Sequence, residues 1–417
     1  MKKWIGLVSV VFFAAGAALY AASLSDVEEL GKQIMFDQKL SVRNNQSCAS
    51  CHDPKAGWAG GVPGINLKGA VYPGSIRTAF GNRKPPSASY ATVAPRLDYD
   101  PDEGLFFGGN FWDGRATGWE LGNPAADQAR GPFLNPVEQA LPSPADVVQR
   151  VCASKYGWLF MALWGDDACD NMTRGYNAVA LSVAAYEASR EVNAYSSKYD
   201  AVQMGKAEFT DQESLGLEVF EGKGRCAACH VLDPQTDGAP RVFTDFTYDN
   251  LGIPKNLNNP FYATDPTFVD KGLGDFLRSL AGDDSWRSAP YVTENIAALD
   301  NETLYELATQ NDGKFKVPSL RNVDLRPGPG FVKAYGHNGY FKSLESIVHF
   351  YNTRDVLPRC ESDMTDAQAM KAGCWPAPEF PDNVNTDELG DLGLSPEEEA
   401  ALVAFLKTLS DGYFKPE

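Results

Sequence analysis

A Cys-x-x-Cys-His pattern occurs twice in this chain of 417 residues, once from Cys48 to His52 and again from Cys226 to His230. Two cysteines three positions apart can form thioether bonds with the two vinyl groups of a haem, and the histidine that follows can coordinate the iron. The pattern therefore predicts two covalent c-type haems. The attachment residues would be Cys48, Cys51, Cys226 and Cys229, and the iron ligands would be His52 and His230.

Two other uses of the same cysteines compete with the haem. A pair of Cys-x-x-Cys motifs can bind one zinc ion, and a single motif can form a thioredoxin-like redox centre. Neither use explains a histidine directly after the second cysteine in both copies. The haem is therefore the preferred interpretation.

The N-terminus and the charge bear on location and partners. Lys2 and Lys3 precede a mostly apolar run from Trp4 to Ala22, which is typical of a signal peptide or a short anchor. Because c-type haem is attached outside the cytoplasm, we expect a periplasmic protein, membrane-bound only if residues 1–22 stay uncleaved. The net charge of −18 disfavours nucleic acid and suits a basic redox protein, or simply a well-solvated surface.

Four further cysteines fall outside the two motifs. Their spacing pairs each with its neighbour in sequence, although four cysteines permit three pairings. We expect disulfides that stabilise the fold rather than take part in chemistry. The predicted bonds are Cys152 to Cys169 and Cys360 to Cys374.

A weak internal repeat precedes the two haem motifs. An apolar helical pattern that contains Leu-Gly runs from Leu30 to Phe36 before the first motif and from Leu215 to Phe220 before the second. A capping box opens each of these helices, at Ser25 and at Thr210.

Length and pattern together predict the fold class. Helical periodicity recurs from Met172 to Arg190 and from Pro396 to Leu409, whereas the intervening stretches are rich in Gly, Pro, Asn and Asp. We expect a mostly α protein with two cytochrome c-like haem domains and long connecting loops. The predicted boundaries are 1–22 for the signal or anchor, 24–205 for the first domain and 206–417 for the second.

From about Leu30 to Leu409 the chain resembles the bacterial dihaem cytochrome c peroxidases and the related MauG enzymes. The motifs that carry the resemblance are Leu30 to Asp37, Phe111 to Arg115, Gln128 to Glu138, Lys316 to Asn322, His337 to Gly339 and Ser343 to Glu345. The resemblance implies that hydrogen peroxide reacts at the first haem and that electrons pass through the second.

The resemblance also implies roles for three residues near the first haem. Glu138 would move the proton of peroxide, Gln128 would orient the peroxide by a hydrogen bond, and Pro132 completes the set. Without the resemblance, Glu138 would be one of many surface carboxylates. About six extra residues, including Trp119, separate Arg115 from Gln128, and they could narrow the entrance to this site.

Trp112 matches the tryptophan that the family places between the two haems, where an oxidisable indole can carry an electron across the gap. A buried core tryptophan is the alternative.

The chain has only four histidines, and none lies between Asp53 and Cys229. A second histidine therefore cannot block the iron opposite His52, and we expect an open first haem, with a methionine or lysine ligand as the alternative.

The ligand opposite His230 decides between two kinds of family member. The candidates are His337, His349, Tyr351, Met364 and Met370. In the family the ligand lies fourteen positions after the His-x-Gly histidine, which here gives Tyr351. Methionine at this position is typical of classical peroxidases, whereas MauG-like members have tyrosine. An anionic phenolate favours ferric and higher states of iron.

The family also binds calcium through an asparagine in a stretch that here reads Asn82 to Pro86, where Lys84 takes the place of that asparagine unless Asn82 shifts into it. The loop from Leu325 to Tyr335, which should supply carbonyl ligands, is enlarged. An ammonium group cannot ligate calcium, so calcium is only a possible cofactor.

The expected function is peroxide-driven oxidation, with a cytochrome c or cupredoxin as donor or with a protein substrate. The alternative is a non-enzymatic electron-transfer cytochrome.

Overall fold

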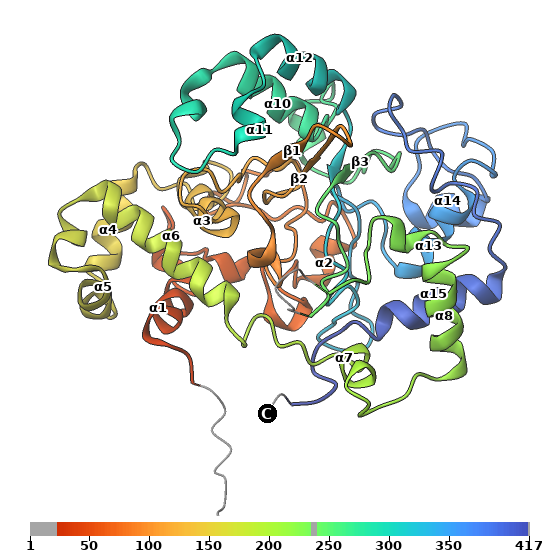
Figure 1. The fold of residues 1–417 in the computed structure, drawn as a ribbon, viewed down its shortest axis with the longest axis horizontal. Helices are drawn as coiled ribbons and strands as arrows, with labels where there is room; N and C mark the ends of the chain where they lie inside the picture. The colour runs from red at the N-terminus through yellow and green to blue at the C-terminus, as the bar shows by residue number, and fades with distance from the viewer. Residues whose placement is uncertain (1–22, 235–239, 416–417) are drawn as a thin grey trace, which may run out of the picture.

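The computed structural model describes residues 23–234 and 240–415, so the predicted signal or anchor lies outside the described residues. The helices gather into three groups around central loops (Figure 1). Short 3₁₀ turns, Cys48–Ser50 and Cys226–Ala228, carry the two haem motifs. The predicted class, mostly α with long loops and two haem-carrying halves, is confirmed.

The first group contains α1 (Asp26–Met35), α3 (Pro124–Leu134), α4 (Pro144–Cys152), α5 (Gly157–Trp164) and α6 (Met172–Ala188). Their apolar faces form one core with Leu30, Phe133, Phe160 and Val179 completely buried. Helices α1 and α6 cross so closely that a Cβ on Gly31 would lie 1.9 Å from the carbonyl oxygen of Ser182.

The second group contains α7 (Lys198–Gln203), α8 (Asp211–Glu221), α13 (Leu344–Thr353), α14 (Asp366–Ala372) and α15 (Pro396–Lys407). Here α8 crosses α15, and a Cβ on Gly216 would lie 2.0 Å from the carbonyl oxygen of Ala401. The Leu-Gly repeat of the sequence thus has one physical cause in both halves, since only glycine permits this helix contact. Tyr199 on α7 belongs to the second core. The domain boundary near residue 205 stays a prediction.

The third group forms the upper lobe of Figure 1 and was not predicted. It comprises α10 (Leu273–Gly282), α11 (Glu294–Ala297) and α12 (Asn301–Gln310), which pack with a hairpin of β1 (Asp98–Asp100) and β2 (Leu105–Phe107). A second two-stranded sheet, β3 (Tyr248–Asp249) with β4 (Phe315–Lys316), joins this lobe to the centre. The remaining short helices are α2 (Pro63–Asn66) and α9 (Phe261–Thr264).

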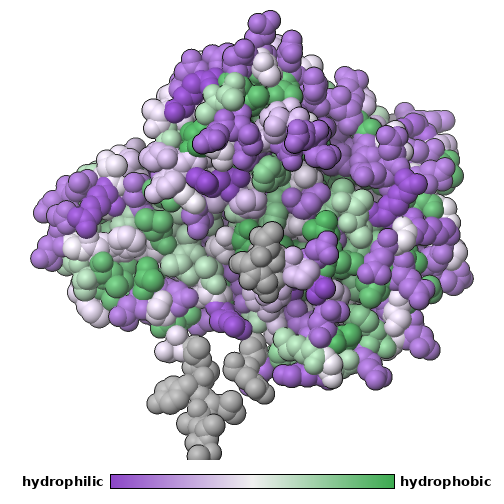
Figure 2. Space-filling view, viewed as in Figure 1, coloured by the Kyte–Doolittle hydropathy of each residue, from purple (hydrophilic) through white to green (hydrophobic). Residues whose placement is uncertain are grey.

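Both predicted capping boxes and both predicted disulfides are confirmed. Ser25 with Glu28 opens α1, and Thr210 with Glu213 opens α8. The disulfides join Cys152 to Cys169 and Cys360 to Cys374. In the part of the chain that the structure describes, each helix is too short or too polar to span a bilayer. The visible face is hydrophilic over most of its upper lobe and rim (Figure 2).

One buried ion pair fixes α7 against the loop before α13. Asp200 accepts two hydrogen bonds of 2.8 Å from the guanidinium of Arg321, and their side chains are only 6% and 1% exposed. The pair lowers the pKa of Asp200, because hydrogen bonds and the charge of Arg321 outweigh its burial.

We predict that Asp200→Asn lowers the free energy of unfolding by about 3–5 kcal/mol, because it leaves a buried cation uncompensated. Urea denaturation at neutral pH measures this loss. The control is Glu345→Gln, which breaks an exposed pair with Lys407 and should cost less than about 1 kcal/mol. Equal losses in the two variants would contradict the prediction.

Candidate haem and peroxide site

The two haem motifs are built alike. The Nδ1–H of His52 donates to the carbonyl oxygen of Trp58 at 3.0 Å, and the Nδ1–H of His230 donates to that of Phe243 at 2.8 Å. Both Trp58 and Phe243 have a left-handed backbone, with φ of 57° and 56°, which is uncommon for aromatic residues. Each hydrogen bond fixes the tautomer and leaves Nε2 available to iron.

Burial keeps both histidines neutral. It lowers the pKa of His52 and lowers that of His230 to about 4. A neutral imidazole is the form that coordinates iron. The histidine ligands are therefore in the state that a haem requires.

The first cavity gathers the residues that the resemblance assigned to peroxide chemistry. Its wall contains His52, Trp112, Gln128, Pro132 and Glu138. Gln128 and Pro132 come from α3, and Glu138 follows that helix in a turn where its N–H donates to the carbonyl oxygen of Asn135 at 2.9 Å. The structure thus brings together residues that lie up to 86 positions apart in sequence.

Glu138 has the environment of a proton carrier. Burial raises the pKa of its carboxyl group, while Arg115 and Asn135 favour the charged form and oppose this shift. Arg115 is itself held by an ion pair with Asp113 of 2.7 Å. A carboxyl group with a raised pKa is suited to both accept and return a proton near neutral pH.

A second buried carboxyl group in the same cavity was missed from the sequence. Glu187 on α6 is 4% exposed and lines the wall with His52 and Gln128. Burial raises its pKa to about 8, so it is largely protonated at neutral pH. The surrounding helix is rich in alanine, and its pattern predicts only packing at this position.

Among the described residues, the wall of the first cavity contains one histidine, His52, and one lysine, Lys84. Apart from two arginines, no other described side chain in this wall carries a basic nitrogen. The Lys84 ammonium instead lies 5.3 Å from the Trp112 ring centroid and donates to the carbonyl oxygen of Pro85 at 3.3 Å. These contacts favour an open coordination position opposite His52.

The second cavity contains His230 and Tyr351 on opposite elements, a 3₁₀ turn and α13. Of the other candidate ligands, only His337 lines this cavity, and its ring stacks on Phe315 with centroids 3.5 Å apart. His349 points elsewhere, since its Nδ1 lies 2.9 Å from Glu399.

The two methionine candidates also lie away from the second cavity. Met364 presents its carbonyl oxygen to the Tyr340 hydroxyl at 3.0 Å, and Met370 is 40% exposed. Tyr351 makes no hydrogen bond through its hydroxyl group within the described residues, and burial raises its pKa. Its phenol is thus placed to bind a metal that can displace the proton.

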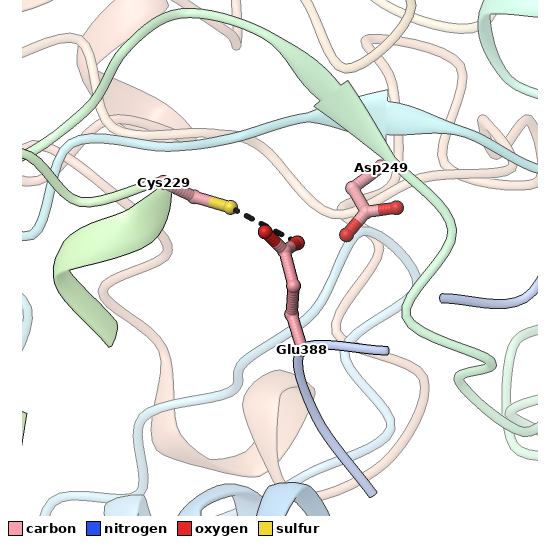
Figure 3. Close-up of side chains that lie close together, drawn as sticks. All are labelled: Cys229, Asp249 and Glu388. Atoms are coloured by element: carbon pink, nitrogen blue, oxygen red, sulfur yellow. Dashed lines mark hydrogen bonds between the residues drawn. The ribbon is translucent and has the colours of Figure 1, made fainter. Parts of the chain in front are cut away.

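Two carboxylates lie at the edge of the second cavity. Figure 3 shows the Glu388 carboxylate between the Cys229 sulfur and the Asp249 carboxylate, and the ligand atoms of the three lie within 4.8 Å of one another. The Asn385 side-chain amide donates to both carboxylates, at 2.7 and 2.6 Å. Because the Cys229 sulfur belongs to the haem motif, we interpret this cluster as an acidic environment of the second haem rather than as a separate metal site. Negative charge favours oxidised iron.

Trp112 lies between the two cavities and contributes to the walls of both. Its indole N–H donates to the carbonyl oxygen of Lys84 at 2.8 Å, and its own carbonyl oxygen accepts from the Lys316 N–H at 2.8 Å. The next residue, Asp113, pairs with Arg83, which also pairs with Asp270. One hydrogen bond thus holds the indole, and the backbone of Trp112 and the side chain of Asp113 are held as well.

The cavities also contain buried lysines that suit the propionate groups of a haem. Lys84 lines both haem cavities, and Lys316 lines the second cavity and the pocket beside His52 and Glu187. Burial lowers their pKa values to about 8 and about 7. Each haem carries two propionate groups, and buried ammonium groups are suitable partners for them. The cysteines, the oriented histidines and these lysines together fit two c-type haems.

The predicted calcium region is dominated by ammonium groups. Lys333 donates to the carbonyl oxygens of Ala56, Asn322 and Leu325 at 2.6–3.1 Å. The Asn82 amide donates to Asp270 at 3.3 Å. Calcium stays a possibility that these contacts do not require.

Comparison with known proteins is consistent with this geometry. The profile of the family described as di-haem cytochrome c peroxidase matches residues 25–208. The methylamine utilization protein MauG of Paracoccus denitrificans is 34% identical over 98% of this chain and 95% of its own length. The chain belongs to the dihaem cytochrome c peroxidase and MauG family. It is therefore a haem-dependent oxidoreductase of the peroxidase type, with two c-type haems and hydrogen peroxide as oxidant.

Other relatives agree. Cytochrome-c peroxidase IdrP1 of Denitromonas iodatirespirans is 29% identical over 93% of this chain and 82% of its own. The crystal structure of the dihaem peroxidase BthA from Burkholderia thailandensis superposes with a TM-score of 0.73 at 29% identity, covering 94% of this chain and 88% of that one. A Y463M variant of BthA gives a TM-score of 0.71.

The extra residues before Gln128 have a structural role. Trp119 is 2% exposed, donates its indole N–H to the carbonyl oxygen of Leu97 at 2.9 Å and packs on Trp286 with centroids 5.3 Å apart. This segment therefore attaches the loop before α3 to the upper lobe. The structure places Trp119 outside the wall of the first cavity.

We predict that Glu138→Gln slows the reaction with peroxide by roughly 10²-fold or more, because the amide cannot accept the proton. Stopped-flow absorbance of the ferric protein measures this rate. The matched control is Glu120→Gln, at an exposed carboxylate before α3, which should react like the wild type. A wild-type rate in Glu138→Gln would remove Glu138 from the mechanism.

The pH dependence of the peroxide reaction rate should follow from the protonation of Glu138. Since only deprotonated Glu138 accepts a proton, a raised pKa moves the acid limb of the rate profile upward. We expect its midpoint above about 4.3, the value for free glutamate, and we expect Glu138→Gln to lose this limb. A midpoint at or below that value would contradict the buried environment.

Proposed function

We propose that this protein is a MauG-like peroxide-driven oxidase that acts on a partner protein in the periplasm. The observation that carries the proposal is the position of Tyr351, which lines the cavity of His230, whereas His349, Met364 and Met370 do not. His337 also lines this cavity, but its ring stacks on Phe315. The similarity to MauG over almost the whole chain supports it. The acidic cluster of Asp249 and Glu388 favours high oxidation states in the same way as a phenolate ligand.

His52 and His230 would hold the two haem irons, with Tyr351 as the second ligand of the latter. The haems supply the redox chemistry that peroxide cleavage requires. In the cavity of His52, Gln128 would orient peroxide and Glu138 would take a proton from one of its two oxygens. Glu138 would then return this proton to the other oxygen, which leaves as water. Glu187 in the same cavity would supply a further proton.

Trp112 connects the peroxide reaction in the first cavity to the second cavity. Because the indole lies in the wall of both cavities and is held by backbone hydrogen bonds, it can give up an electron on one side and recover it from the other. Its fixed position means that little rearrangement accompanies each transfer. The two oxidising equivalents of one peroxide molecule can therefore be shared between the two sites.

A cytochrome c peroxidase with a small electron-donor protein is the second candidate function. The IdrP1 and BthA relatives, which are named as peroxidases, support it. In this case a cytochrome c or a cupredoxin would reduce the second haem. The acidic surface, with a net charge of −18, suits a basic donor of this kind.

A peroxide titration of the ferric protein without reductant tests the proposal. We expect loss of a high-spin ferric EPR signal and a long-lived product that holds both oxidising equivalents of one peroxide. Two low-spin ferric haems that react only after one-electron reduction would indicate a reductively activated peroxidase. No reaction in either state would indicate an electron carrier.

The Tyr351 assignment has its own test. We predict that Tyr351→Met raises the midpoint potential of the second haem by on the order of several tenths of a volt, because a neutral sulfur replaces an anionic oxygen. Potentiometric titration followed by absorbance measures the potential. As a control, His349→Gln should change the midpoint potential of the second haem by only a small fraction of that shift. An unchanged potential in Tyr351→Met would assign the ligand to another residue.

A further inference from the structure

Tyr90 occupies a position that the peroxide mechanism does not use. Its ring is 2% exposed and belongs to the wall of a pocket that it shares with His52, Trp112 and Glu187. Trp112 leads from this region to the second cavity, whereas Tyr90 lies toward the junction with the C-terminal segment. A second oxidisable side chain thus contacts the first haem site.

The hydroxyl group of Tyr90 has a built-in proton acceptor. It donates to Asp411 Oδ2 at 2.7 Å and accepts from the Tyr195 N–H at 3.0 Å. Burial and the charge of Asp411 raise the pKa of Tyr90, so the phenol is neutral at rest. The other oxygen of Asp411 accepts from the Ser196 N–H at 2.8 Å, and Asp411 is partly exposed, so a proton received there can reach solvent.

Tyr195 continues the path outward. The rings of Tyr90 and Tyr195 meet edge to face with centroids 4.9 Å apart, and Tyr195 is partly exposed. Both residues have a left-handed backbone, with φ of 60° and 48°. Two adjoining tyrosines in this uncommon conformation indicate that the fold holds the contact against local strain.

The Arg321 guanidinium lies over both rings, at 5.1 Å from the centroid of Tyr90 and 4.7 Å from that of Tyr195. A fixed cation disfavours a positively charged tyrosine radical. Loss of an electron therefore requires loss of the phenolic proton, and for Tyr90 Asp411 is the acceptor. The pairing of Arg321 with Asp200 limits how strongly the cation opposes oxidation.

We propose that Tyr90 and Tyr195 form a second outlet for oxidising equivalents, which lets the first haem site oxidise small phenolic donors at the surface. This inference rests on the proposed reaction with peroxide. Tyr90 gives one electron into the His52 site and its proton to Asp411, and Tyr195 then restores Tyr90. A phenol at the surface gives one electron and one proton to Tyr195, so two phenols and one peroxide yield two phenoxyl radicals and two waters.

The test uses the ferric holoprotein, mixed with peroxide and frozen at intervals for EPR. Absorbance recorded in parallel reports the reaction of the haem itself. We expect a tyrosyl radical signal that narrows when the protein is grown with ring-deuterated tyrosine and that guaiacol removes. Tyr90→Phe and Asp411→Asn should each abolish the signal, and Tyr195→Phe should retain it but slow its removal by guaiacol.

The control is Tyr305→Phe on α12, a helix that lines neither haem cavity, which should behave as the wild type. A normal haem absorbance change with no tyrosyl signal, or with the same signal in Tyr90→Phe, would overturn this inference alone. If peroxide causes no absorbance change at all, the proposed function fails, and the outlet fails with it.

Discussion

The position of Trp112 is the constraint on which the rest of the structure depends. Two cavities built by separate helix groups must approach each other closely enough to share one indole in their walls. The long loops between the helices make this approach possible. A hydrogen bond to Lys84 holds the indole, and one from Lys316 holds the Trp112 backbone. The chain from Asp113 through Arg83 to Asp270 then ties this junction to the upper lobe.

Charge is distributed around the junction in an orderly way. Buried lysines line the walls near Trp112 and would suit haem propionates, whereas Asp249 and Glu388 lie beside Cys229 in the second cavity. The first site has carboxyl groups with raised pKa values, at Glu138 and Glu187. The first site is therefore suited to proton transfer, and the acidic second site agrees with the proposed storage of oxidising equivalents there.

Much of this could be predicted from sequence. The haem motifs, the capping boxes and the Leu-Gly helices each depend on local residue types. Glu138 was singled out through resemblance to a family, and its role in proton transfer stays a prediction. The upper lobe was not predicted, because its helices lie within a stretch rich in glycine, proline and asparagine. Glu187 and Tyr90 were not predicted either, since the roles proposed for them arise only when distant segments form one wall.

The left-handed residues illustrate the same limit. Trp58 and Phe243 orient the two ligand histidines, and Tyr90 and Tyr195 make their ring contact from the same backbone conformation. Aromatic residues disfavour this conformation, so no sequence pattern indicates it. Tertiary contacts impose it, and of these four residues Tyr90 lines a pocket shared with His52.

The most direct test of the central claim is stopped-flow absorbance of the ferric wild type and of Trp112→Phe after mixing with one equivalent of peroxide. If Trp112 joins the two sites, both proteins react with peroxide at similar rates, but only the wild type shows prompt oxidation of the second haem. Equally prompt oxidation of the second haem in Trp112→Phe would show that electrons cross by another route, and would contradict the account.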